Sequence, residues 1–248
     1  MIIEAVIFDF MGTLAVVKEY SARDPVEKMY ESLVHDYSEI DYKHFREVYD
    51  AVHRKYWILR YENLREVTNA VGLSETLNQL GFATKPGDEA VKKAVNVYFE
   101  DYLRSLKPRS CALRTLRTLS DFYSLGLVSN FTYSPVIHAG LRKLRLNPYF
   151  DVILISQDVG WRKPLPKIFQ EALKRLRRGA KETVFVGDNP LEDIQGAKKM
   201  GMKTVFIPSQ FFTLEDVKKM SQQPDIIINS LCELPTVLSR MQHNTEKN

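Results

Sequence analysis

The chain opens on a short apolar segment that ends in a carboxylate. Residues 2–14 read IIEAVIFDFMGTL, and the β-branched and aromatic residues before Asp9 are typical of a strand buried in a parallel sheet. Ligands bind beyond the carboxyl ends of the strands in open α/β sheets, so Asp9 stands where a ligand site is expected. An aspartate before a Gly-Thr turn can also serve only as a turn cap, and the rest of the chain decides between these two interpretations.

Three later segments place polar side chains at comparable points. Residues 125–130, LGLVSN, predict a strand that ends in a hydroxyl and an amide. Residues 161–166, WRKPLP, place Lys163 just before a helix. Residues 183–193, TVFVGDNPLED, predict a second buried strand that ends in a carboxylate-rich turn.

In chain order the four segments read Asp-x-x-Gly-Thr, Ser-Asn, Lys-Pro and Gly-Asp-x-x-x-x-Asp. This order and spacing resemble the four motifs of the haloacid dehalogenase superfamily of phosphatases and related hydrolases. The resemblance covers about residues 1–16 and 105–230, and the segment between them is compatible with the helical cap of that superfamily.

After residue 105 the chain alternates between predicted strands and helices. Alternation of this kind predicts a parallel sheet with right-handed crossovers and helices on both faces. Helices are expected to start at Ser134-Pro135 and at Pro166. The strands are predicted at 2–9, 123–129, 151–156, 183–187, 203–207 and 225–229.

Residues between about 24 and 105 show helical spacing of apolar side chains with no strand pattern among them. Asp24-Pro25 is a helix start, with an N-cap followed by proline at the first helical position. Four amphipathic helices are typical of a small bundle packed over a sheet. Their apolar faces fall at 26–37, 45–56, 91–102 and, more weakly, at 67–71, where the helix is expected to end near Gly72.

The fold class predicted from these patterns is a doubly wound parallel α/β sheet, Rossmann-like, with an inserted α-helical cap. The core is expected to comprise residues 1–16 and 105–236, the cap residues 17–104, and the polar C-terminal tail residues 237–248. Hinges between core and cap are expected near 15–18 and 106–109.

Composition favours an ordinary soluble protein. The net charge of +4 is spread along the chain, and the densest basic cluster, at residues 174–181, is typical of a solvated helix end rather than of a nucleic-acid patch. No apolar run approaches the roughly 20 residues of a membrane span, and the start of the chain lacks a leader pattern. We therefore expect a cytoplasmic monomer or homodimer with no nucleic-acid or membrane partner.

The two cysteines, Cys111 and Cys232, lie far apart in the sequence and form no CxxC pair. They are interpreted as small buried hydrophobic residues rather than as a disulfide framework, which suits a reducing compartment.

The superfamily resemblance implies that Asp9 is a nucleophile that attacks phosphorus and forms an aspartyl-phosphate. Repulsion between two anions requires a cation, and the resemblance implies that Mg²⁺ is the cofactor. Its ligands would be carboxylates and one main-chain carbonyl: Asp9, Asp188, Asp193 and the carbonyl of Met11. Asp193 could instead hold a metal-bound water or the loop, and Glu192 could take its place.

The same resemblance assigns catalytic roles to Ser129 and Lys163. Ser129 and Asn130 would donate hydrogen bonds to the phosphoryl group, and Lys163 would neutralise charge that develops there. Thr13 is expected to bind substrate as part of the first motif. Asp158 is a candidate partner that would orient Lys163, or simply a surface carboxylate.

Met11 departs from the phosphatase pattern, in which a second aspartate stands two residues after the nucleophile. That aspartate protonates the leaving alkoxide and later activates water, and a missing general acid/base typically removes a factor of about 10²–10⁴ in rate. Members without this aspartate include haloacid dehalogenases and phosphonoacetaldehyde hydrolases, so three enzymatic interpretations are compared.

The 2-haloacid dehalogenase alternative is favoured by Met11 because a halide needs no proton. It is disfavoured by Phe169, where similar dehalogenases carry a tyrosine, and by Asp188, because those enzymes bind no metal. The phosphonatase alternative needs a cap lysine for a Schiff base, and Lys55 is the candidate by position.

We favour a Mg²⁺-dependent hydrolase of phosphorylated small molecules. A family member that binds a phosphorylated ligand or a protein without turning it over remains a further alternative. Substrate identity is expected to depend on the cap, from which Arg60, Arg65 and His53 could reach the site, and Arg60 is taken as the substrate-binding candidate.

Overall fold

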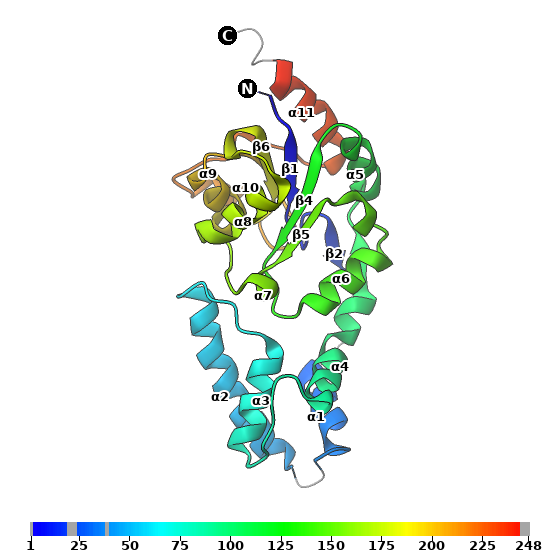
Figure 1. Cartoon of the computed structure of the whole chain (residues 1–248), viewed down its shortest axis with the longest axis vertical. Coiled ribbons are helices and arrows are strands. Elements are labelled where there is room, and N and C mark those ends of the chain that lie inside the picture. Colours follow the sequence, from blue (N-terminus) through cyan, green and yellow to red (C-terminus); the bar gives the residue numbers. More distant parts are fainter. Residues whose placement is uncertain (1, 19–23, 38–39, 244–248) are drawn as a thin grey trace.

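The computed structural model describes residues 2–18, 24–37 and 40–243 (Figure 1). The strands are β1 Ala5–Phe8, β2 Ala15–Val17, β3 Leu106–Pro108, β4 Ser124–Ser129, β5 Val152–Ile155, β6 Thr183–Gly187, β7 Lys203–Phe206 and β8 Ile226–Ile227. The α-helices are α1 Pro25–Val34, α2 Tyr42–Tyr61, α3 Asn69–Gln79, α4 Glu89–Ser105, α5 Ala112–Ser120, α6 Ser134–Lys143, α7 Ser156–Val159, α8 Pro166–Leu176, α9 Gly196–Lys199, α10 Leu214–Lys218 and α11 Leu234–His243. Short 3-10 helices are η1 Asn147–Tyr149, η2 Ala180–Glu182 and η4 Leu231–Glu233, and η3 Pro190–Gln195 is a π-helical turn.

A six-stranded sheet in the order β5-β4-β1-β6-β7-β8 forms the core, and each of its strand pairs is parallel. β1 lies in the middle, between β4 and β6, although more than a hundred residues separate it from either strand in the sequence. Its four residues are fully buried, as expected of a strand covered on both faces. The predicted doubly wound α/β sheet is confirmed.

Alternation of side chains along β1 sends neighbouring residues to opposite faces of the sheet. Val6 and Phe8 pack in the cluster that includes the apolar residues of α5, α6 and α11. Ala5 and Ile7 pack in the cluster formed with α8 and α9. Figure 1 shows these two groups of helices on opposite sides of the strands.

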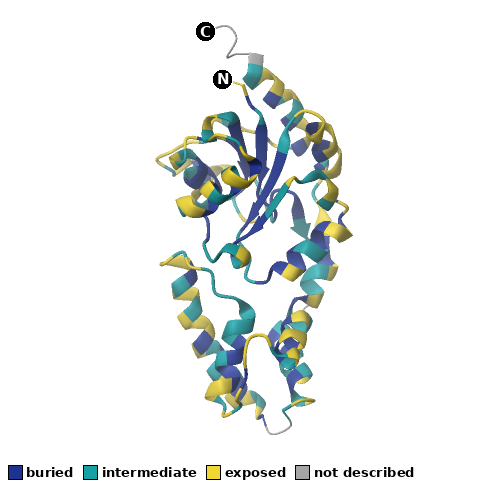
Figure 2. Cartoon of the chain, viewed as in Figure 1, coloured by how far each residue is buried: buried dark blue, intermediate teal, exposed yellow. Residues whose placement is uncertain are grey.

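Helices α1–α4 form a separate group beyond the carboxyl ends of the strands (Figure 1). β2 and β3 pair antiparallel where the chain leaves the sheet and where it returns, at the predicted hinge positions. The buried faces of α1–α4 join the main apolar cluster of the core, and Figure 2 shows their outer faces exposed. Residues 19–23, between β2 and α1, and residues 38–39, between α1 and α2, lie outside the described residues.

Helix α1 begins as predicted, with Asp24 accepting a hydrogen bond from the main-chain N–H of Val26. The prediction that the third helix ends near Gly72 is wrong, because α3 runs on to Gln79. Thr68 caps its start, and Gly72 lies inside it against the ring of Tyr56. The packing against α2 outweighs the low helix propensity of one glycine.

The C-terminal segment is more ordered than its polar composition predicts. The sequence predicts a polar tail from residue 237, but α11 extends to His243 and its Leu238 is fully buried against the core. Gln242 donates a hydrogen bond to the carbonyl of Ile3 at 2.9 Å. Residues 244–248 lie outside the described residues.

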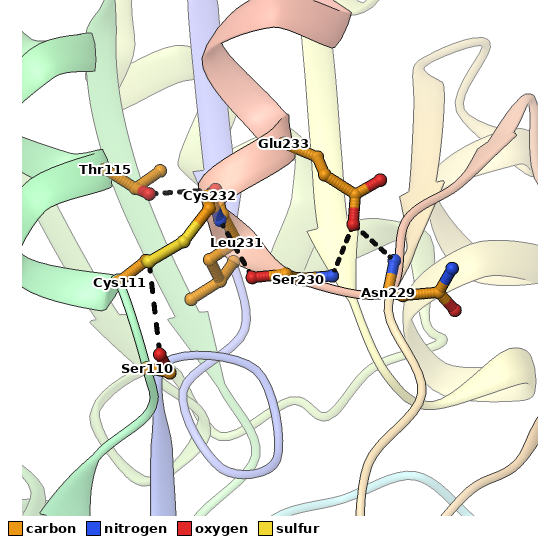
Figure 3. Close-up of a disulfide and its surroundings, with 8 residues drawn as sticks. All are labelled: Ser110, Cys111, Thr115, Asn229, Ser230, Leu231, Cys232 and Glu233. Carbon is orange, nitrogen blue, oxygen red and sulfur yellow. Dashed lines mark hydrogen bonds between the residues drawn. A yellow bond between two sulfur atoms is a disulfide. The ribbon is translucent and has the colours of Figure 1, made fainter.

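The interpretation of the cysteines as unpaired, buried residues is wrong. Cys111 and Cys232 form a disulfide with a Cα–Cα distance of 5.4 Å, although 121 residues separate them, and Cys232 is exposed (Figure 3). Thr115 in α5 also donates a hydrogen bond to the carbonyl of Leu231 at 2.9 Å, so η4 is held against α5 beside the disulfide (Figure 3). A disulfide between the two cysteines gives no support for a reducing compartment.

No helix among the described residues is both long enough and apolar enough to cross a membrane.

Candidate active site

Three buried carboxylates meet at the carboxyl ends of the two central strands. Asp9 follows β1, Asp188 follows β6, and Asp193 lies in η3, one turn farther on. One ligand oxygen from each lies within 4.8 Å of the others, so the three could hold a metal ion together. The parallel pairing of β1 with β6 brings the first two together, and Asp9 N–H donates to the carbonyl of Val186 at 2.9 Å.

Two glycines allow the carboxylates to approach the main chain. Gly12 has a φ of +84°, and a Cβ at this position would collide with the carboxylate of Asp188. A Cβ on Gly187 would collide with Asp193 in the same way. The glycines of the first and fourth motifs are therefore required by the close packing of the site.

Lys163 lies among these carboxylates and is fully buried. Its Nζ donates to Asp9 Oδ1 at 2.8 Å and to the carbonyl of Val128 at 2.8 Å, and it lies 2.7 Å from Asp193 Oδ1. Burial alone would lower the pKa of Lys163, but Asp193 and Asp9 more than offset this and raise it. The lysine is a permanent cation at the site.

Burial raises the pKa of Asp9 well above its ordinary value, and the charges of Asp193 and Asp188 add to this effect while Lys163 opposes it. Burial and Asp193 likewise raise the pKa of Asp188 to about 7. One lysine thus leaves the three carboxylates short of positive charge, which favours binding of a further cation.

The side chains that contact Asp188 are hydroxyls. Thr13 Oγ1 donates to Asp188 Oδ1 at 3.3 Å, so the structure places Thr13 against a carboxylate rather than free in the cavity. Ser209 Oγ donates to Asp188 Oδ2 at 2.5 Å. Ser209 does not stand out in the sequence, where its one signal is its position just beyond the strand β7.

Ser129 is the last residue of β4, which lies next to β1, and Asn130 follows it. The side chain of Asn130 accepts from Lys163 N–H at 2.8 Å and donates to the carbonyl of Lys163 at 3.0 Å. This pair of bonds fixes the main chain that carries the lysine. Ser129 is buried at the end of β4, on the strand that neighbours the one carrying Asp9.

Asp158 does not pair with Lys163. It is exposed on the short helix α7, where its Oδ2 lies 4.0 Å from His138 Nε2. Asp193, on η3, instead lies beside Lys163, in the position expected for Asp158. Glu192 is outside the group of three carboxylates that could share a metal ion.

A cavity of about 570 Å³ lies between the strand ends and helix α2. Met11 and Asn130 line it from the sheet side, and Arg60 and His53 line it from α2. Among the described residues no aspartate or glutamate lines this cavity. Burial and nearby Arg60 lower the pKa of His53, so its neutral form is favoured at pH 7.

The three cap residues singled out from the sequence have different positions. Arg60 is buried, and its Nε and Nη2 donate to the carbonyl of Val67 at 2.9 and 2.6 Å. Arg65 is exposed and does not line the cavity. Lys55, the Schiff-base candidate, is exposed and its Nζ donates to Glu75 at 2.8 Å.

Comparison with known proteins agrees with this geometry. The model of the haloacid dehalogenase-like hydrolase family matches residues 6–207. Glyceraldehyde 3-phosphate phosphatase of Methanopyrus kandleri is 30% identical over 188 residues, which are 73% of this chain and 79% of that protein. Ribulose-1,5-bisphosphate 5-phosphatase of Halopiger xanaduensis is 32% identical over 160 residues, 62% of this chain and 66% of that protein.

Several other curated relatives are matched over only about half of their length. Among solved structures, 2-haloacid dehalogenase from Pseudomonas syringae pv. Tomato DC3000 has a TM-score of 0.67 and 25% identity, and the match covers 97% of this chain and all of that one. The match of the family model over most of the chain, together with the four motifs gathered at the strand ends, shows that this chain belongs to the haloacid dehalogenase-like hydrolase family.

Proposed function

We propose that the chain is a Mg²⁺-dependent phosphatase of small phosphorylated molecules that acts through an aspartyl-phosphate on Asp9. The observation that carries this proposal is the buried group of Asp9, Asp188 and Asp193, whose oxygens lie within 4.8 Å of one another beside a single lysine. A negatively charged substrate can enter such a site only if a cation offsets the repulsion.

The residues present fit a hard divalent cation. Carboxylate and carbonyl oxygens are the ligands that Mg²⁺ prefers, with water and phosphate completing its shell. Asp9, Asp188, Asp193 and the main-chain carbonyl of Met11 would hold the ion. When bound, it supplies electrostatic stabilisation of the phosphoryl oxygens.

The chain's own residues carry the covalent chemistry. A carboxylate oxygen of Asp9 forms a bond to phosphorus while the bond from phosphorus to the leaving oxygen breaks, and the leaving group departs with that electron pair. Water then forms a bond to phosphorus and loses a proton to the solvent, while the bond from phosphorus to the Asp9 oxygen breaks and releases inorganic phosphate and the free Asp9 carboxylate. Lys163 would neutralise charge on Asp9 and on the phosphoryl group, and Ser129 and Asn130 would donate hydrogen bonds to that group.

Met11 determines which leaving groups suit this site. Its side chain lines the cavity, and no carboxylate among the described residues lines it to protonate a leaving alkoxide. We therefore infer a preference for leaving groups that depart readily as anions, such as those of aryl and acyl phosphates.

The names of the similar proteins support the phosphatase proposal, since both relatives described above are named as phosphatases. The dehalogenase alternative is supported by Met11 and by the fold of the dehalogenase from Pseudomonas syringae. Against it, Phe169 is fully buried in the core against Phe185, and Asp188 adds a buried carboxylate. The phosphonatase alternative is disfavoured because Lys55 is paired with Glu75 and does not line the cavity.

The test is a panel of p-nitrophenyl phosphate, acetyl phosphate, an alkyl phosphate and a 2-haloacid, each with Mg²⁺ and with excess EDTA. We expect turnover of the first two with Mg²⁺, slow turnover of the alkyl phosphate, and none in EDTA or in Asp9→Asn. Halide release that continues in EDTA would instead assign the dehalogenase activity. Absence of turnover on the whole panel would favour a binding protein.

A further inference from the structure

A buried glutamate in the segment between α2 and α3 holds two arginines from different parts of the chain. The side chain of Glu66 is 1% exposed. Its Oε2 accepts from Arg162 Nη1 at 2.6 Å and from the hydroxyl of Ser156, and its Oε1 lies 3.5 Å from Arg60 Nε. Arg60 belongs to α2, whereas Arg162 immediately precedes the lysine of the site.

Both arginines line the cavity described above, which Met11 and Asn130 also line. Arg60 is 6% exposed and Arg162 is 4% exposed, so two buried guanidinium charges contact one buried carboxylate. Glu192 lies within electrostatic reach of Arg162, but it does not line the cavity. Apart from His53, the ionisable cationic side chains that line the cavity among the described residues are therefore these two arginines, and no carboxylate lines it beside them.

Some hydrogen-bond donors of the two arginines have no partner among the described residues. Within the described part of the chain, Arg162 Nε is buried and has no hydrogen-bond partner. The hydrogen bonds of Arg60 to Val67 use its Nε and Nη2, and none among the described residues uses its Nη1. A buried donor without a partner is costly, so a ligand that accepts from Arg162 Nε is favoured.

Attachment of the segment between α2 and α3 to the core does not explain why two arginines contact Glu66. Main-chain bonds already join the segment to the core, from Glu66 N–H to the carbonyl of Gly160 at 3.0 Å and from Arg162 N–H to the carbonyl of Leu64 at 3.1 Å. Aromatic side chains supply much of the remaining lining, including Tyr61, whose ring centroid lies 5.1 Å from the Arg162 guanidinium. A planar, partly apolar molecule with a charged end fits such a cavity.

We propose that Arg60 and Arg162, oriented by Glu66, form an anion subsite that binds a second anionic group of the substrate, a carboxylate or a phosphate, while the first phosphoryl group lies at Asp9. The inference rests on the proposed function and names its substrate class: phosphate esters with an anionic group at the far end of an apolar or aromatic body. Glu66 is a positioning residue in this scheme, since it acts through the two arginines.

The experiment separates binding from turnover. The ligands are 4-(carboxymethyl)benzylphosphonate and its neutral carboxamide, which cannot be hydrolysed and differ only in the distal charge. Calorimetry with Mg²⁺ present should show the carboxylate binding the wild-type protein about tenfold more tightly than the carboxamide, because it gains charge-assisted hydrogen bonds. A third ligand, a p-xylylene bisphosphonate, distinguishes a preference for a carboxylate from a preference for a phosphate.

The variants test the assignment to these arginines. Arg60→Met and Arg162→Met should each bring the ratio of the two dissociation constants toward one, and Arg65→Met, a matched exposed arginine of the same segment, should leave it unchanged. Glu66→Gln, which keeps the shape and removes the opposing charge, should keep or increase the preference. If the methionine variants do not fold, the ratio of the two dissociation constants in the wild-type protein and in Glu66→Gln still tests the inference.

Equal affinities for the carboxylate and the carboxamide in the wild-type protein would overturn this inference, as would a preference that survives in both methionine variants. Turnover of phosphate esters without the binding preference would overturn the inference alone. The binding preference without Mg²⁺-dependent turnover would overturn the proposed function and leave the subsite supported.

Discussion

Replacing Asp188 by asparagine should stabilise the metal-free protein while it removes metal-dependent activity. Asp188 is 2% exposed, and burial with the charge of Asp193 raises its pKa from the ordinary 3.8 to about 7. A carboxyl whose pKa is higher in the folded state than in the unfolded state destabilises the folded state when it is ionised. The difference between a pKa of 3.8 and a pKa of about 7 corresponds to about 4 kcal/mol. Asparagine removes the charge and keeps one of the two oxygens, so it still accepts from either Thr13 or Ser209, which contact different oxygens of Asp188.

The sign of the effect depends on pH. Below about pH 3 the carboxyl is mostly protonated in both the folded and unfolded states, so wild type and Asp188→Asn should differ little through this group. As the pH rises toward 7, the unfolded state ionises first, and the metal-free wild type loses stability that the variant keeps. At pH 8 we expect Asp188→Asn to be more stable by about 2–4 kcal/mol, or roughly 5–15 °C in Tm.

The assay is thermal and urea unfolding in EDTA at pH 4.5 and pH 8, repeated with Mg²⁺. Mg²⁺ at about 100 times its Kd should stabilise the wild type by about 2.7 kcal/mol and the variant far less. Asp225→Asn is a control that should change the stability in the opposite direction. Burial would raise the pKa of Asp225, but Lys203, Thr204 and Lys198 lower it, so this variant should be less stable at pH 8.

A variant Asp188→Asn that is less stable than wild type in EDTA at pH 8 would refute the reasoning. Equal stabilisation of both proteins by Mg²⁺ would also contradict it, because the three carboxylates would then not form the metal site.

Three further predictions concern other residues. Met11→Asp should raise turnover of alkyl phosphates by up to about 10²-fold and of aryl phosphates far less, measured as kcat, because it restores a general acid; equal gains on both would contradict this role. Lys163→Met should lose activity and about 3–5 kcal/mol of stability at pH 8 by urea unfolding, since it leaves buried carboxylates unpaired, whereas Lys167→Met, an exposed lysine, should change neither. Cys232→Ser should lower the stability of the oxidised protein by about 2–5 kcal/mol and should not alter the reduced protein, measured with and without dithiothreitol; equal unfolding curves for oxidised wild type and variant would show that the 121-residue link is not formed in solution.

Local patterns determined much of the fold. A buried strand of four apolar residues followed by Asp9 could be predicted because covered parallel strands require continuous apolar runs. The N-cap and proline at Asp24 and Pro25 predicted the start of α1 for a similar local reason. The resemblance of the four motifs also indicated which residues would meet, since parallel strands place their carboxyl ends at one edge.

Contacts between distant segments could not be predicted from the sequence, because they depend on how the whole chain packs. Cys111 and Cys232 join because α5 and η4 pack together, and nothing in either local sequence encodes that proximity. The end of α3 at Gln79 rather than Gly72 likewise reflects packing against Tyr56, which outweighs local propensity.

The site shows the same division. The chemical types of the residues at the strand ends could be predicted from the sequence, because motif spacing is a local property of strands and turns. The partners of those residues required three dimensions: Asp193 rather than Asp158 lies beside Lys163, Ser209 contacts Asp188, and Glu66 holds Arg162. Partners of this kind come from separate loops, whose relative positions are set by packing of the whole chain and not by any one segment of it.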